Sequence, residues 1–279
     1  MKLKKSTLFY YSLAEMPINI ALFPILVFIP KFYTGEMGVP LALAANIILA
    51  VRIFDVFTDP VVGYINDRTN TKWGRRRPWI AIATPLLMVS IYMLFIPPEG
   101  AGALHLFLWM FLLSIGTTML IIPYYAWGAE LSPDYNERSR ITGWRSISGV
   151  VGSLSAQLIP TIALVFFGLG GSTNVLYIVG IASVIIMPIC VFLTVLKVPE
   201  SKDYVKSNIS PIKGFKIMLE NSPFKRLIMA FMFGGIAFSI TIPLYLFFIA
   251  YVLKAEEMAI FMLTFFYLTN IIAVPFWVW

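Results

Sequence analysis

The sequence has 279 residues, of which 59% are hydrophobic and only 13% are charged, and its mean hydropathy is +0.84. Soluble globular chains carry roughly 25% charged residues, so this composition excludes a soluble globular protein. The net charge of +7 does not indicate a nucleic-acid partner, because the basic residues are distributed over separate polar connections rather than gathered in one patch.

Eight apolar runs follow one another along the chain, and each is long enough to cross a hydrocarbon core about 30 Å thick. In lipid such runs must form helices, because a lone strand would leave its backbone polar groups without partners. The sequence therefore predicts an all-α, polytopic membrane protein. The predicted spans are 8–32, 40–65, 79–97, 104–125, 141–168, 174–196, 227–252 and 257–279.

The basic residues alternate across the predicted spans. Of the 21 Lys and Arg residues, 18 precede the first span or lie in every second connection, whereas the opposite side holds only Lys31 and Lys254. This asymmetry follows the positive-inside rule and predicts a cytoplasmic N-terminus. We expect a multi-pass protein of the plasma membrane, in a bacterium the inner membrane. The single cysteine, Cys190, lies in a predicted span, so disulfides are not expected.

The connections indicate two blocks of helices. Residues 1–196 hold six spans with short connections, and residues 197–226 form a polar, cytoplasmic linker in which Ile212–Leu219 can form a short amphipathic helix. Residues 227–279 hold two further spans. This layout predicts the major facilitator fold of two six-helix bundles, with the chain as a fragment holding about eight of twelve spans.

The second predicted span carries Arg52, Asp55 and Asp59 at positions i, i+3 and i+7, which share one helix face. Charged groups at membrane depth are costly and usually mark an ion or substrate pathway. Two carboxylates one turn apart, with Thr58 beside them, can bind Na⁺ or form a proton site, and Arg52 can offset part of their charge when no cation is bound. The alternative is a buried ion-pair cluster that only fixes helix packing.

Further polar residues lie in the first, fourth and fifth spans. Glu15 needs a partner, which Arg52 or Arg145 can provide, or it extends to the cytoplasmic interface. Tyr125 offers an aromatic face on which a sugar can stack. Thr118 can add a hydroxyl to the aspartate pair, although such threonines more often bond to their own backbone.

Residues in and beside the cytoplasmic connections form a predicted gating or conformational motif, in which charged contacts can lock one conformation and release in the other. Gly63 is predicted to permit close helix approach, and Asp67 to cap a helix or pair with an arginine. The alternative is that the charges only set topology. The predicted gating residues are Gly63, Asp67, Arg68, Gly74, Arg75, Arg77, Glu130, Glu137 and Arg138.

Two blocks of residues carry a resemblance to a known family. The first is Arg52-Ile-Phe-Asp55-x-x-x-Asp59-Pro60-x-x-Gly63 followed by Trp73-Gly74-x-x-x-Pro78-Trp79, and the second runs from Ile122-Pro123 through Glu137-Arg138 to Arg145. With these blocks the chain resembles the glycoside–pentoside–hexuronide:cation symporter family (melibiose permease-like) of the major facilitator superfamily.

The resemblance implies roles for individual residues. Asp55 and Asp59 resemble the family's cation ligands, with Thr58 and Thr118 at the positions of helper oxygens. The positions similar to the family's sugar-binding residues are Glu15, Asn19, Tyr125 and Arg145. Two departures stand out: Ile121 replaces an acidic sugar ligand, and Glu15 lies one turn before Asn19.

These observations predict a secondary transporter that couples uptake of a sugar or glycoside to Na⁺ or H⁺ by alternating access. We expect a monomer in membrane lipid that needs no cofactor beyond the coupling ion and is not an enzyme. The alternative is a lipid or amphiphile carrier of the same fold, which Ile121 favours. An intramembrane aspartyl protease is disfavoured, because Asp55 and Asp59 share one helix and cannot face each other across a peptide.

Overall fold

The computed structural model describes residues 2–168, 172–200 and 211–254, together with single positions between 262 and 276. These residues form helices and no strand, apart from one isolated bridge between Thr71 and Gly74. The predicted all-α fold is therefore confirmed. The chain divides into two compact units, Met1–Lys202 with Tyr267–Trp279, and Asp203–Phe266.

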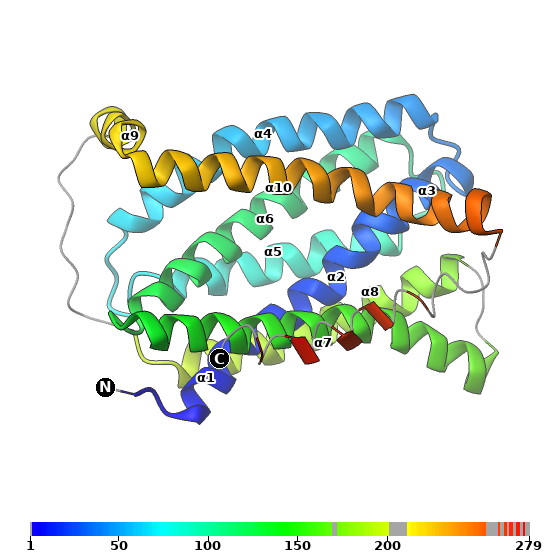
Figure 1. The fold of residues 1–279 in the computed structure, drawn as a ribbon. Coiled ribbons are helices and arrows are strands. Elements are labelled where there is room, and N and C mark those ends of the chain that lie inside the picture. The colour runs from blue at the N-terminus through cyan, green and yellow to red at the C-terminus, as the bar shows by residue number, and fades with distance from the viewer. Residues whose placement is uncertain are drawn as a thin grey trace. The chain divides into compact units, whose positions relative to one another are not determined.

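The first unit is a bundle of long helices joined by short connections (Figure 1). α2 packs against α7 and α8, α4 packs against α6, and α5 packs against both α6 and α8. The helices are α1 (Lys5–Ser12), α2 (Glu15–Val27), α3 (Ile29–Gly35), α4 (Leu41–Arg68), α5 (Arg77–Phe95), α6 (Ala103–Glu130), α7 (Tyr135–Phe167) and α8 (Ser172–Lys197).

Five helical stretches among the described residues are long and apolar enough to cross a membrane. They confirm that the chain is a multi-pass membrane protein, because each is long enough, at 19 to 28 residues, to cross a bilayer core. These stretches are Lys5–Leu26, Leu41–Arg68, Arg77–Phe95, Ala103–Glu130 and Leu176–Lys197.

The second unit contains α9 (Pro211–Glu220) and α10 (Ser222–Phe247), and α10 continues into a π-helical turn, Phe248–Leu253. α9 lies where the short helix 212–219 was predicted. Most of the predicted span 257–279 lies outside the described residues.

The first predicted span, 8–32, is divided into α1, α2 and α3 rather than forming one helix. Pro17 has no N–H to donate to the carbonyl of Leu13, and this carbonyl instead accepts from the N–H of Met16 at 3.3 Å. Pro30 at the start of α3 marks the second interruption, after Phe28. Prolines therefore explain both interruptions of the predicted helix.

Two glycines of α7 allow α2 and α7 to approach closely. A Cβ atom at Gly152 would overlap the backbone carbonyl oxygen of Met16, and one at Gly149 would lie 3.1 Å from Nδ2 of Asn19. By contrast, a Cβ at Gly63 would lie 3.8 Å from its nearest neighbour, Ile122, which is an ordinary contact. The space around Gly63 therefore does not require a glycine in this structure, and its role in close helix approach stays a prediction.

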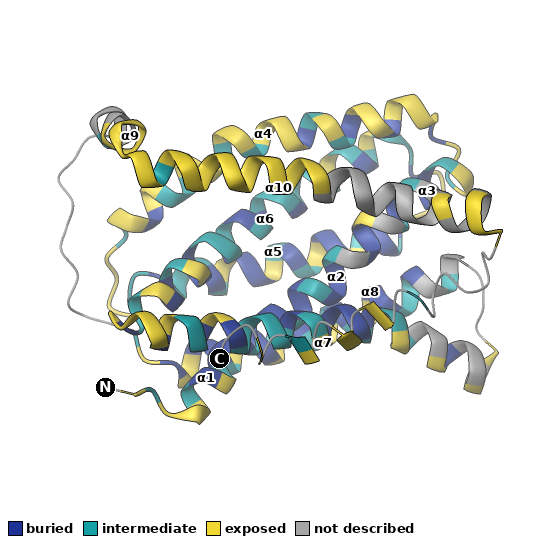
Figure 2. Cartoon of the chain, viewed as in Figure 1, coloured by how far each residue is buried: buried dark blue, intermediate teal, exposed yellow. Residues whose placement is uncertain are grey.

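Burial differs sharply between α2 and α4. Figure 2 shows α2 largely buried and α4 largely exposed along its length. The exposed side chains of α4 are mostly apolar, including Phe54, Val56 and Phe57. Such a surface suits hydrocarbon or another apolar partner rather than water. Arg52, Asp55 and Asp59, near the middle of α4, are therefore charged residues on an otherwise largely apolar helix surface.

Candidate functional site

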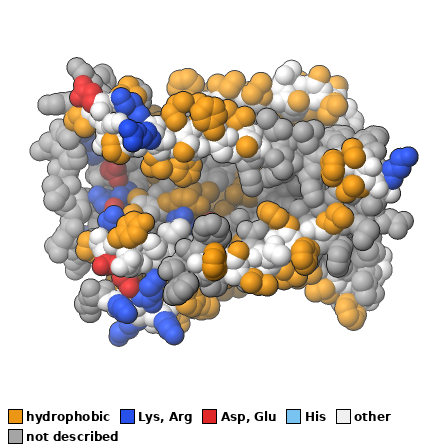
Figure 3. Space-filling view, viewed as in Figure 1, with side chains coloured by type: hydrophobic (Ala, Val, Ile, Leu, Met, Phe, Trp, Pro, Cys, Tyr) orange, Lys and Arg blue, Asp and Glu red, His pale blue; other side chains and the backbone are white. Residues whose placement is uncertain are grey.

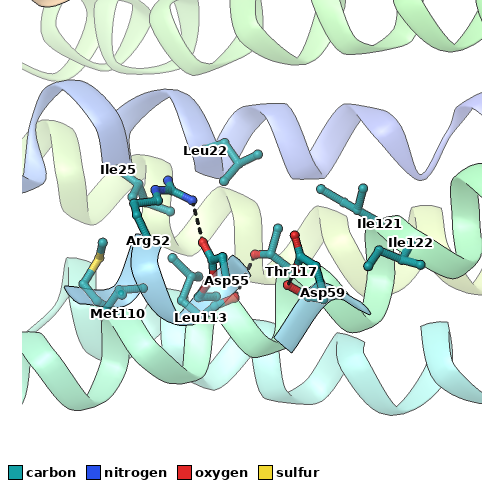
Figure 4. Close-up of a pocket in the computed structure, with 13 residues that line it drawn as sticks. Leu22, Ile25, Arg52, Asp55, Asp59, Met110, Leu113, Thr117, Ile121 and Ile122 are labelled. Atoms are coloured by element: carbon teal, nitrogen blue, oxygen red, sulfur yellow. Dashed lines mark hydrogen bonds and ion pairs between the residues drawn. The ribbon is translucent and has the colours of Figure 1, made fainter. Parts of the chain in front are cut away.

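The candidate site is a cavity of about 160 Å³ between α2, α4 and α6. Figure 4 shows Arg52, Asp55 and Asp59 together on one stretch of α4, with Leu22 and Ile25 of α2 nearby. Most of the remaining lining is apolar. The full lining is Leu22, Ile25, Val51, Arg52, Asp55, Asp59, Met110, Leu113, Ser114, Thr117, Thr118, Ile121 and Ile122.

Asp55 is held from two sides. Its Oδ2 atom pairs with Nη1 of Arg52 at 3.2 Å, and its Oδ1 atom accepts a hydrogen bond from the hydroxyl of Ser114 on α6. The Asp55 side chain is 18% exposed and that of Arg52 is 54% exposed. The charge of Asp55 is thus offset by one arginine, which can move away at modest cost because it is largely exposed.

Asp59 has a different set of partners. Its Oδ1 atom accepts a hydrogen bond of 2.8 Å from the hydroxyl of Thr118. Within the part of the chain that the structure describes, no basic side chain forms an ion pair with Asp59. A carboxylate without a basic partner beside a cavity suits a mobile cation.

The structure does not bring Thr58 to the cavity. Its hydroxyl donates to the backbone carbonyl of Phe54 at 3.2 Å, and Thr58 is absent from the lining. Thr117 lines the cavity, but its hydroxyl donates to the carbonyl of Leu113 at 2.7 Å. Both threonines thus bond one turn back along their own helix, a common outcome for hydroxyls inside helices.

Glu15, Tyr125 and Arg145 form a second cluster, contributed by α2, α6 and α7. The Tyr125 hydroxyl donates to Oε1 of Glu15 at 3.0 Å, and Nε of Arg145 lies 4.0 Å from Oε2. The Arg145 guanidinium also lies 3.8 Å from the centre of the Tyr125 ring. Arg145, rather than Arg52, is therefore the partner of Glu15.

Asn19 lies one turn along α2 from this cluster, but its side chain is used locally. Nδ2 of Asn19 donates to the backbone carbonyl of Glu15 at 2.9 Å. Tyr125 lies seven residues after Thr118 on α6, which corresponds to about 10 Å along a helix. The aspartate cavity and the Glu15 cluster are therefore two distinct sites, with Thr118 and Tyr125 about two turns apart on α6.

A third cluster surrounds Arg76, at the connection between α4 and α5. Arg76 is 4% exposed and pairs with Asp67 at 2.8 Å and with Glu130 at 2.6 Å, while Asn66 accepts a further hydrogen bond. Burial alone would lower the pKa of Arg76, but the hydrogen bonds to Glu130 and Asp67 outweigh burial, so the pKa is raised. Arg75 also pairs with Glu130, at 2.5 Å.

Glu200 is bound at the start of α5. Its Oε1 atom accepts from the backbone N–H groups of Arg75 and Arg76 at 2.6 and 2.7 Å. A carboxylate is favourable there because the N-terminal end of a helix carries unpaired N–H groups and partial positive charge. Gly74 has φ +117, a backbone conformation that favours glycine, and a Cβ there would displace the Glu200 carboxylate.

The remaining predicted gating residues make local contacts. The guanidinium of Arg68 lies 3.9 Å from the Tyr64 ring on its own helix, and Nη2 of Arg77 donates to the carbonyl of Val198 at 2.8 Å. Nε of Arg138 donates to the Ser132 carbonyl at 2.9 Å. Figure 3 shows basic side chains gathered at the end of the first unit near the N-terminus.

Glu137 connects the N-terminus to α7. Oε2 of Glu137 accepts from the N–H of Leu3 at 3.0 Å, and Oε1 pairs with Arg140 at 2.5 Å. The Leu3 hydrogen bond, followed by the Arg140 contact, lowers the pKa of Glu137.

Four residues of these clusters were not predicted from the sequence: Ser114, Asn66, Arg76 and Glu200. Ser114 lies four residues before Thr118 and hence on the same helix face, which could have indicated it. Arg76 lies between two arginines that were predicted, and nothing in the run distinguishes it. Glu200 approaches the α4–α5 connection from the end of α8, a proximity that requires the tertiary fold.

A membrane-spanning helical bundle with charged side chains lining a cavity is typical of solute transporters. Residues 10–279 match the family described as MFS/sugar transport protein, and the chain belongs to this family. It is a family of transporters, which confirms both the predicted family resemblance and the prediction that the chain is not an enzyme.

Curated relatives agree with this assignment. The chain is 29% identical to the isoprimeverose transporter of Lactiplantibacillus pentosus, over 77% of this chain and 46% of the relative. It is 26% identical to the putative glycoside/cation symporter YagG of Escherichia coli K12, over 82% of this chain and 50% of that protein. It is also 26% identical to the mouse sodium-dependent lysophosphatidylcholine symporter 1, over 90% of this chain and 54% of that protein. The chain thus spans about half the length of these relatives.

Proposed function

We propose that this chain supplies the N-terminal part of a secondary transporter that couples uptake of a sugar or glycoside to Na⁺ or H⁺. The supporting observation is the cavity in which Asp55 and Asp59 lie one turn apart on α4, with the Thr118 hydroxyl on Asp59. The relatives named as glycoside/cation and sodium-dependent symporters support the coupling.

In this proposal, a bound cation neutralises the negative charge that Asp55 and Asp59 leave in the cavity. With Arg52 on Asp55, the cavity holds one carboxylate, Asp59, that has no basic partner among the described residues. A monovalent cation that binds between the two aspartates removes the cost of a charge held at membrane depth. The loaded cavity can then change its exposure from one side of the membrane to the other without moving an uncompensated charge.

The cluster of Glu15, Tyr125 and Arg145 is the proposed solute site, with Asn19 at its edge. A carboxylate and a guanidinium 4.0 Å apart can both hydrogen-bond to sugar hydroxyls, and the Tyr125 ring offers an apolar face to a pyranose. Tyr125 is 38% exposed, so part of its ring is accessible. The cation and solute sites share α2 and α6, so movement of either helix affects both.

The decisive experiment uses Asp59→Asn in the full-length protein, reconstituted in vesicles. Uptake of labelled isoprimeverose, other glycosides and lysophosphatidylcholine is measured under separately imposed Na⁺ and proton gradients. We expect uptake driven by one of these gradients, and a decrease of at least tenfold in Asp59→Asn with unchanged protein in the membrane. Asp134→Asn is the matched control, because Asp134 lies exposed in the α6–α7 connection and Asn can replace it as a helix cap. Gradient-driven uptake that survives in Asp59→Asn would reject the proposal.

A second candidate is a carrier of lysolipids or similar amphiphiles. Ile121 and Ile122 line the cavity, as do Leu22, Ile25 and Met110, so much of its wall is apolar. The alignment with the sodium-dependent lysophosphatidylcholine symporter 1 of mouse covers 90% of this chain at 26% identity. Uptake of lysophosphatidylcholine, with no competition from free sugars, would favour this candidate over a sugar carrier.

We further propose that the N-terminus is cytoplasmic, that the membrane is the bacterial inner membrane, and that the protein acts as a monomer. The bundle of residues 1–196, the linker 197–226 and the helices after 227 would then form two halves of one transporter. The clusters around Arg76 and Glu137 would lie at the cytoplasmic end and change partners during the transport cycle. The positive-inside distribution of Lys and Arg supports this orientation.

A further inference from the structure

We propose that Ser114 is a ligand of the cation site and that Ser114 and Thr118 together make this site selective for an alkali cation such as Na⁺. This inference rests on the proposed function, because it assumes that a cation binds at Asp55 and Asp59. It adds a residue that is absent from the sequence-based set of ligands, and it chooses between the two coupling ions.

Two pairs of side chains face each other across the α4–α6 contact. Asp55 and Asp59 lie four residues apart on α4, and Ser114 and Thr118 lie four residues apart on α6. Each hydroxyl donates to the aspartate opposite it, Ser114 to Oδ1 of Asp55 and Thr118 to Oδ1 of Asp59. All four side chains line the same cavity.

These two hydroxyls differ from others in the bundle. Thr58, Thr84, Ser90, Thr117 and Ser155 each donate to a backbone carbonyl four residues earlier on their own helix. That bond is available to any Ser or Thr inside a helix. Ser114 and Thr118 instead bond to carboxylates of another helix, so their oxygens lie beside the charged groups.

The arrangement suits an alkali cation better than a proton. A proton needs a single acceptor, whereas hard metal cations bind several oxygen ligands. Two carboxylates and two hydroxyls provide such a set from side chains alone. The cavity of about 160 Å³ also has room for an ion and several waters, each of which occupies ~30 Å³.

Binding of ²²Na⁺ to the purified full-length protein tests the inference. Ser114→Ala is expected to weaken Na⁺ binding at least fivefold, and Ser114→Thr, which keeps the hydroxyl, is expected to stay within twofold of the unsubstituted protein. Thr117→Val is the matched control within the same cavity, because the Thr117 hydroxyl bonds to Leu113. Thr117→Val should also stay within twofold.

Asp59→Asn separates the two proposals. If Asp59→Asn abolishes ²²Na⁺ binding while Ser114→Ala binds normally, Ser114 is not a ligand but the cation site stands. If Asp59→Asn also binds Na⁺ normally, the proposed cation site itself is wrong. Should Ser114→Ala fail to fold, Ser114→Cys replaces it, because sulfur is a poor ligand for hard cations. Normal Na⁺ binding by Ser114→Cys would overturn the inference.

Discussion

Glu15 shows how neighbouring groups determine the use of a buried carboxylate. It is 9% exposed, and Tyr125 satisfies one of its oxygens while the other, 4.0 Å from Arg145, has no hydrogen-bond partner among the described residues. A buried oxygen that lacks a partner is costly, so a ligand that donates a hydrogen bond to it gains affinity. A hydroxyl of a bound solute can fill this place between Glu15 and Arg145.

Glu137 gives rise to a pH-dependent prediction outside the predicted spans. Because its pKa is lowered in the folded protein, its contribution to stability is fully present above the ordinary pKa of a glutamate, about 4.3. The contribution is lost as the pH falls through the lowered value. We therefore expect Glu137→Gln to lower the melting temperature at pH 7 and to have a smaller effect at pH 3.

Thermal unfolding in detergent at both pH values checks this prediction. Glu36→Gln is the control, because it makes the same chemical change at an exposed glutamate directly after α3. An equal loss of melting temperature at pH 7 and pH 3 in Glu137→Gln would contradict the assigned role of the Leu3 and Arg140 contacts.

At the scale of helices, the contact between α2 and α7 depends on glycine. Gly152→Ala would force the new Cβ against the carbonyl oxygen of Met16, and backbone atoms cannot rotate out of the way as a side chain can. We expect a loss of about 1–3 kcal/mol in the free energy of unfolding, as is typical for overpacking. Gly63→Ala should be tolerated or slightly stabilising, because its Cβ meets nothing closer than 3.8 Å and Ala favours the helix.

Unfolding by denaturant in mixed micelles compares the two variants directly. Gly63→Ala is the matched control, since it makes the same chemical change within a helix of the same unit. If both substitutions destabilise the protein equally, close approach of α2 and α7 is not the cause.

The helices illustrate what could be predicted from sequence. Apolar run length is enough to predict α4, α5, α6 and α8, because the bilayer thickness sets a minimum length. The division of the first run at Pro17 and Pro30 is a local effect that the prolines could have indicated. The neighbour of Gly63 could not be predicted, because a glycine in a helix does not show which residue, if any, lies against it.

Site residues that lie on a single helix could be predicted from the sequence, whereas contacts between different helices could not. Asp55 and Asp59 follow from their spacing on α4 alone. The contacts of Ser114 with Asp55 and of Glu200 with the start of α5 join residues 59 and 125 positions apart. Such contacts depend on how helices pack, which sequence periodicity does not determine. For the same reason, the sequence left two possible partners for Glu15, Arg52 and Arg145, and did not choose between them.

At the scale of the whole molecule, the orientation in the membrane is the feature on which the transport mechanism depends. The proposed cation and solute sites lie within the first unit, and the proposed orientation places the cluster around Arg76 on the cytoplasmic side. The chain offers a direct test, because its single cysteine, Cys190, is buried in α8 and should react little with a polar reagent.

Cysteines introduced at Lys72 and Glu99 report on the two sides of the membrane. Lys72 is exposed in the α4–α5 connection and Glu99 is exposed in the α5–α6 connection, at opposite ends of α5. In intact cells we expect a membrane-impermeant maleimide to label Glu99→Cys and to leave Lys72→Cys unlabelled, whereas lysed membranes should allow both to react. The unsubstituted protein is the control for Cys190. Labelling of Lys72→Cys from outside the cell would reverse the proposed orientation, because 18 of the 21 basic residues would then lie on the outer side.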